Sequence, residues 1–199
     1  MAGLLNASAN GGKPLADPIL QNIERQIESK VPPNLKQQYM AIIVAGMAIM
    51  YSEKSKKFIV ERMKASPDMA KNVANGVADL VLMVFQNSGI KPDDTPRAQM
   101  FFDAAMLSCI ALMCQVLDLG EKIGALKAST DMVDKCTELT YKETMRRFGV
   151  TEEMVRADPG RHRRRGRVVG EVVDGAGVVE EHPPVVPPHR HHVGRRAGL

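Results

Sequence analysis

Apolar residues recur along the first 158 positions with the spacing of an α-helix. Isoleucines at every fourth position, separated by polar residues, predict an amphipathic helix from Pro18 to Lys30. A capping residue followed by proline marks a helix start, because the missing N–H of proline needs no partner at the first helical position. Three such pairs occur: Asp17-Pro18, Ser66-Pro67 and Thr95-Pro96.

The remaining pattern predicts an all-α bundle of about five helices, with a short sixth helix that begins at Thr151. No segment of residues 1–158 alternates apolar and polar positions with the period of a strand. Gly89 and the pair Gly149-Val150 stand where helices are expected to end. The other expected helices run from about Leu35 to Ala65, Pro67 to Asn87, Pro96 to Leu119 and Thr130 to Phe148.

Two segments, Tyr39 to Tyr51 and Ala104 to Leu117, are apolar on every side. A small bundle covers only one side of such helices, so we expect surplus apolar area that binds other protein. Alanines at every fourth position of the third helix would let a neighbouring helix approach closely. The expected interaction surface comprises Tyr39, Ile43, Met47, Met50, Ala70, Ala74 and Ala78.

Both apolar segments are shorter than the ~20 residues that a helix needs to cross a bilayer. We therefore expect no stable transmembrane span. Membrane action stays open as an alternative in which the same two segments enter a bilayer after partial unfolding.

The chain changes character near Asp158. Residues 1–158 carry 19 basic and 19 acidic side chains, whereas residues 159–199 carry eight arginines and four acids and hold the whole net charge of +4. All five histidines also fall in this second part. We expect a flexible arm over residues 1–13, a helical domain over residues 14–158 and a disordered tail rich in Arg, Val, Gly, Pro and His over residues 159–199.

The tail has competing interpretations. As a genuine basic arm it would bind phosphate or nucleic acid through five guanidinium groups, and as a solvated, variable tail it would bind nothing. Its abrupt loss of Lys, Ile and Asn also fits a GC-rich gene read out of frame beyond Asp158, which the nucleotide sequence would decide. The arginines of the basic cluster are Arg161, Arg163, Arg164, Arg165 and Arg167.

The helical domain lacks residues that most catalytic sites need. The first histidine is His162, so the domain has no imidazole base, histidine metal ligand or Ser-His pair. Gly11-Gly12-Lys13 lacks the rest of a phosphate-binding loop. The carboxylates of Asp131, Asp134 and Glu138 have no histidine partners for a di-metal site. We expect no enzyme activity, no cofactor and no metal.

The expected location is the cytoplasm. Cys109, Cys114 and Cys136 suit neither a disulfide framework nor a zinc site, which indicates buried free thiols in a reducing compartment. The first residues, Met1 to Asn6, lack the basic region and the apolar run of a secretory signal.

The segment Met-Arg-Arg-Phe-Gly-Val-Thr-Glu-Glu at residues 145–153, with the Met- and Ala-rich helices and their proline-opened starts, resembles the small helical virion proteins of tailed bacteriophages. The resemblance covers about residues 35–155. It implies a non-enzymatic part of the particle, either a structural subunit or a protein ejected with the DNA, found in the host cytoplasm and then in the virion. The predicted function is therefore a non-catalytic assembly protein that binds itself or other proteins.

Overall fold

The structure, a computed structural model, describes residues 15–65, 68–91 and 94–150 and confirms the all-α bundle. No strand occurs in these ranges. The arm over residues 1–13, the tail with its arginine cluster and the short helix expected from Thr151 lie outside them. The helices are α2 (Pro18–Lys30), α3 (Lys36–Met50), α4 (Glu53–Ala65), α5 (Met69–Asn87), α6 (Thr95–Lys122) and α7 (Thr130–Arg147).

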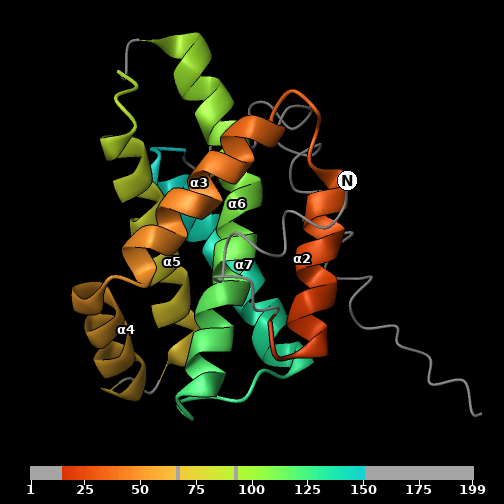
Figure 1. The fold of residues 1–199 in the computed structure, drawn as a ribbon, viewed down its shortest axis with the longest axis vertical. Coiled ribbons are helices and arrows are strands. Elements are labelled where there is room, and N and C mark those ends of the chain that lie inside the picture. Colours follow the sequence, from red (N-terminus) through yellow and green to blue (C-terminus); the bar gives the residue numbers. More distant parts are fainter. Residues whose placement is uncertain (1–14, 66–67, 92–93, 151–199) are drawn as a thin grey trace, which may run out of the picture.

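The central element is α6, around which α2, α3, α5 and α7 pack (Figure 1). Every residue of α6 from Ala104 to Gly120 is buried. Full burial of one large apolar side chain contributes about 1.5–3 kcal/mol. A helix that buries such side chains on all sides therefore organises the whole core, and α4 lies outside this group against α5 and α3.

Polar contacts hold the first helix and its lead-in segment on α6. The fully buried carboxylate of Asp118 accepts a hydrogen bond from the backbone N–H of Ala16 at 2.8 Å and pairs with the ammonium of Lys122 at 2.5 Å. One turn away, the side-chain amide of Gln115 donates to Glu24 Oε1 at 2.7 Å. This seam fixes α2 in register along α6.

The far ends of α5, α6 and α7 meet in an aromatic cluster. The ring centroid of Phe85 lies 5.0 Å from that of Phe101 and 5.5 Å from that of Phe148, with edge-to-face geometry in both pairs. Arg147 adds a polar link, because its Nε donates to Asp79 Oδ1 on α5 at 2.7 Å. The end of the described chain is thus anchored to two other helices.

Several sequence signals are confirmed. The side chain of Asp17 accepts from the backbone N–H of Ile19 at 2.7 Å and caps α2, which begins at Pro18. Gly149 has φ of +73°, and the Val150 N–H donates to the Met145 carbonyl at 3.0 Å, which is the expected glycine stop of α7. Gly89, with φ of +72°, follows α5, but there the next N–H, that of Ile90, donates to the Ser88 hydroxyl at 3.2 Å.

The single helix expected over residues 35–65 is wrong, because it is broken after Tyr51 into α3 and α4. The Ser52 hydroxyl donates to the Ile49 carbonyl at 2.8 Å and accepts from the Ser55 N–H at 3.4 Å, so one side chain serves both helix ends. The break coincides with the change from apolar to charged residues. It raises the number of described helices to six.

Two helix starts are shifted from their expected positions. Asp68 caps α5 by accepting from the Lys71 N–H at 3.2 Å, whereas the expected pair Ser66-Pro67 lies outside the described residues. Thr95 is the first residue of α6 and Asp94 occupies the cap position. The helix also ends later than expected, at Lys122, because glycine at position 120 is accommodated inside the buried helix.

The seam between α2 and α6 contains a carboxylate, that of Glu24, whose charged form is destabilised by burial. Burial raises the pKa of Glu24 above its ordinary value, although the hydrogen bond from Gln115 opposes this. The side-chain oxygen of Gln115, Oε1, is buried without a hydrogen-bond partner. We predict that Glu24→Gln stabilises the fold by about 1 kcal/mol and raises Tm by roughly 2–4 °C, because an amide removes the buried charge and can donate to that oxygen.

The pH dependence follows from the direction of the shift. A raised carboxyl pKa in the folded state means that the charged form costs stability at neutral pH, and that this cost vanishes as the pH falls to the ordinary glutamate value. The gain from Glu24→Gln should therefore shrink between pH 7 and pH 4.5 in thermal unfolding followed by circular dichroism. Glu28→Gln on the same helix is the control, and an equal gain from it would contradict the assignment.

Two helical glycines give opposite predictions. A Cβ on Gly46 of α3 would lie 2.9 Å from both terminal methyl groups of Leu112, which is fully buried on α6. A Cβ on Gly76 of α5 meets nothing within 4 Å. Gly76→Ala should stabilise the protein by about 0.5–1 kcal/mol through helix propensity. Gly46→Ala should lose that gain to crowding, and Gly46→Val should destabilise by about 1–3 kcal/mol, as measured by chemical denaturation.

Candidate interaction surface

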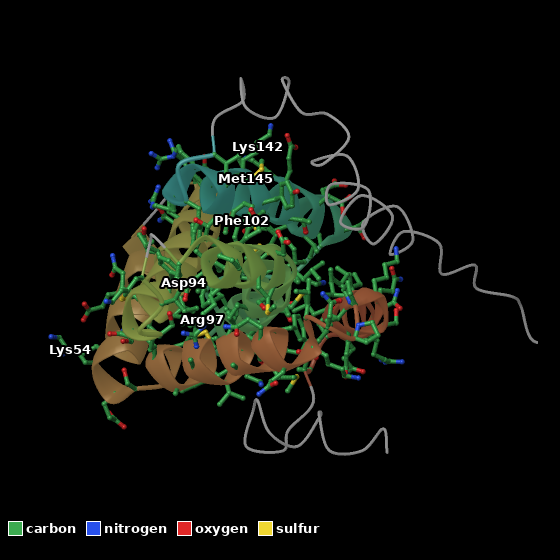
Figure 2. The ribbon with its side chains drawn as sticks, turned by 90° about the horizontal axis from the view of Figure 1, so that it is seen from above. Lys54, Asp94, Arg97, Phe102, Lys142 and Met145 are labelled. Atoms are coloured by element: carbon green, nitrogen blue, oxygen red, sulfur yellow. The ribbon has the colours of Figure 1, made fainter. Side chains whose placement is uncertain are left out.

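α3 is apolar on both sides, and the two sides meet different surroundings. One side is buried against α5 and α6, while the other faces solvent. Figure 2 shows α3 along one edge of the bundle and α7 along the opposite edge, with α5 and α6 between them. The exposed positions of α3 after its first residue, Lys36, are Gln37, Ala41, Val44, Ala48 and Tyr51, of which Tyr51 is the residue that ends the helix.

The interaction surface expected from the sequence is the wrong side of these helices. All seven of its residues are covered within the single chain, with exposed fractions of 5% or less. A helix that is apolar all round gives no periodic signal of which side faces the core, and the close approach that the alanines of α5 permit is made inside the bundle. The buried residues are Tyr39, Ile43, Met47, Met50, Ala70, Ala74 and Ala78.

The exposed positions of α3 form one straight stripe, which we call the outer stripe. Their spacing alternates between four and three residues, the a and d spacing of helices that pack along their length. No charged residue occurs between Lys36 and Glu53. Val44 at the centre of the stripe is 48% exposed. The stripe is therefore uncharged, and its middle is made of small and medium apolar side chains.

Two hollows flank α3 and continue its apolar surface. The larger has a volume of about 580 Å³ and lies between α3, the end of α5 and the start of α6. Its α3 wall includes Ala41, Ala45 and Ala48, and Met100 lies on the α6 side. The smaller, of about 130 Å³, lies between α3, α4 and α5, and Ile49 lines both hollows.

The large apolar side chains that stay exposed are all part of this region. Among the described residues they are Val44 and Tyr51 on α3, Met83 beside the smaller hollow and Met100 beside the larger one. Their exposed fractions lie between 36% and 48%. Scattered exposed apolar residues are ordinary, but a group around one uncharged helix indicates a binding surface. We call this region, the outer stripe with its two hollows, the α3 surface.

Charged groups border the α3 surface without entering its centre. Two basic residues, Lys54 and Lys57, and two acidic ones, Glu53 and Glu61, are exposed on α4 beyond the end of α3. Arg97 lines the larger hollow and pairs with Asp94 at 3.6 Å. Lys54, Asp94 and Arg97 are labelled in Figure 2. This arrangement can bury apolar area against a partner and orient it by charges at the rim.

The cysteines line neither hollow, and their buried thiols are expected to be unreactive. Cys109, Cys114 and Cys136 are buried and free, as expected. Burial raises the pKa of Cys109 and of Cys136 to about 12 and raises the pKa of Cys114 further. Such thiols carry almost no thiolate at neutral pH. Within the described ranges, no group of three or more His, Cys, Asp or Glu residues is placed to hold a metal ion.

α6 is long and apolar enough to cross a membrane by length and composition alone, since it extends beyond the segment expected from the sequence. In the bundle, 83% of its most apolar window is buried by the rest of the protein. Of the two apolar segments, the one on α3 offers surplus apolar area among the described residues and residues 104–117 of α6 do not, which corrects the expectation that both would do so.

The fold and this surface define a small all-α bundle with one uncharged, partly open helix. No protein-family model, curated protein or solved structure matches the chain. The function is therefore inferred from the geometry of the α3 surface.

The sequence does not indicate which residues of α3 form the outer stripe. Its members share a heptad spacing, but so do the buried residues on the other side of α3. The one available signal is size, because two alanines flank Val44 on the outside whereas isoleucine and methionine predominate inside. Core helices usually place their larger side chains inward.

Burial of the thiols can be checked directly. We predict that none of the three cysteines reacts with an aromatic disulfide reagent at pH 8 while the protein is folded, and that all three react after denaturation. The rate of colour release measures this. Rapid reaction of even one thiol in the folded protein would contradict the described packing of α6 and α7.

Proposed function

We propose that the protein is a non-catalytic helical assembly protein that binds copies of itself or other proteins through the α3 surface. The observation that carries the proposal is the uncharged outer stripe, which continues into two apolar hollows and includes Val44 at 48% exposure. Burial of such a surface is favourable by about 25 cal/mol per Å². An assembly subunit needs a surface of this kind, whereas a catalyst needs converging ionisable groups.

The ionisable groups support the same proposal. Asp118 is committed to Ala16 and Lys122, and Arg147 to Asp79 and Glu143, so both act as links between or along helices. Neither hollow is lined by more than one acidic or basic side chain, namely Asp79 in the smaller and Arg97 in the larger. A subunit of a bacteriophage virion is one setting for such a protein and agrees with the resemblance of its helices.

Two other roles are weaker. Entry of residues 104–117 into a bilayer would require the bundle to open, because these residues are buried against the surrounding helices. Binding of phosphate or nucleic acid by Arg161–Arg167 concerns residues outside the described part of the chain and rests on charge alone.

A photo-crosslinking amino acid at position 44 tests the proposal. We predict that benzoylphenylalanine in place of Val44 yields a discrete protein adduct when the full chain is irradiated in the cells that produce it, because the α3 surface is covered there. The same residue in place of Thr130, which is exposed on α7, is the control, because α7 lies along the edge of the bundle opposite α3 (Figure 2). Mass spectrometry of the adduct identifies its components.

Equal labelling at positions 44 and 130, or no protein adduct at position 44, would overturn the proposal. An adduct between position 44 and lipid would instead support the membrane alternative.

A further inference from the structure

We propose that the occupant of the α3 surface is a second copy of this chain, with the two α3 helices packed antiparallel across a two-fold axis. The inference deepens the proposed function and rests on it. A two-fold interface brings the same patch of both copies together, so it needs a patch that is complementary to itself.

The outer stripe is complementary to itself in the antiparallel direction. With the axis midway along α3, Ala41 lies opposite the partner's Val44, and Gln37 lies opposite the partner's Ala48. Both of these layers combine one alanine with one larger side chain, whereas Tyr51 of each copy lies beyond the start of the partner helix. Because a and d positions alternate on opposed helices, the larger side chains enter the spaces that the alanines leave, and the helix axes can approach to about 8 Å.

Charge favours the antiparallel direction over the parallel one. The last turn of α3 contains no basic residue, so no cation within the helix itself stands at its carbonyl end. Antiparallel packing places the exposed ammonium of Lys36 beside that end of the partner helix, where a cation is stabilised by the helix dipole. Parallel packing would bring both Lys36 side chains together instead.

The hollows add apolar contact area to that of α3, which is too short to form a stable dimer interface alone. α3 has 15 residues and a length of about 22 Å, whereas a stable dimer buries about 800 Å² on each partner. Met83 and Met100, exposed by 41% and 45%, lie on the two flanks of α3 and extend the apolar contact beyond the stripe. Each hollow is lined by one charged side chain, Asp79 in the smaller and Arg97 in the larger, and the outer stripe itself carries none.

Sedimentation equilibrium of the full chain measures the pairing. We expect a mass of twice 21.8 kDa at micromolar concentration, and at least a 100-fold rise of the dimer Kd in Val44→Asp, which places two carboxylates at the contact. Thr130→Asp, on the opposite edge, should leave Kd unchanged. Because Val44 is half exposed, the circular dichroism spectrum of Val44→Asp should match that of the parent chain. Its Tm should match that of the parent chain measured at concentrations below the dimer Kd, since pairing itself stabilises the folded state, and this separates lost pairing from lost folding.

Cysteine cross-linking tests the orientation. Under mild oxidation the double variant Gln37→Cys with Ala48→Cys should form covalent dimers in high yield, since each new thiol faces the other type across the axis. Ala48→Cys alone should not, because two copies of position 48 lie about 16 Å apart along the helices. The three native thiols are buried and do not compete. A covalent dimer from Ala48→Cys alone would overturn the antiparallel arrangement.

The two proposals fail in different ways. A chain that sediments as a monomer, yet is photo-crosslinked at position 44 to a different protein, overturns self-pairing and leaves the assembly function in place. A monomer that gives no protein adduct at position 44 overturns both.

Discussion

Complete enclosure of residues 104–120 of α6 is the constraint on which the rest of the structure depends. A helix segment buried on every side needs partners for its polar groups inside the protein, and two of these groups find them in different ways. The Ser108 hydroxyl donates to the Ala104 carbonyl one turn earlier at 2.9 Å, and Asp118 is neutralised by Lys122 and the Ala16 N–H. The surrounding helices pack where they cover α6. The aromatic cluster holds α5 and the end of α7 at one end of α6, and the seam holds α2 at the other.

The same constraint explains why α3 is left half open. α3 covers one side of α6, and the inner residues of α3 are buried in that contact. Its outer residues are nevertheless uncharged, so the sequence does not mark them as a solvent face. The Ser52 junction ends this uncharged stretch abruptly, and the lysines and glutamates follow on a separate helix. The charged residues that follow this stretch are thereby placed on α4, while α3 keeps an apolar exterior.

Local signals in the sequence predicted the helical class, the ends of α2 and α7 and the buried thiols. These features depend on residues adjacent in the chain, such as Asp17 with Pro18 or Gly149 with Val150. The break after Tyr51 was not predictable from glycine or proline, because a serine side chain makes it. The outer stripe was not predictable either, since the orientation of a uniformly apolar helix is decided by contacts with residues more than sixty positions away, as in the approach of Gly46 to Leu112.

The two sides of α3 also separate two kinds of evolutionary constraint. Residues such as Gly46 and Met47 are tied to the core, so their replacement is limited by folding. Ala41, Val44 and Ala48 touch no other part of the core to a comparable degree, so drift at these sites alters recognition at little cost to the bundle. Under the proposed function, substitutions there would change which surface the helix binds while the architecture of the bundle is conserved.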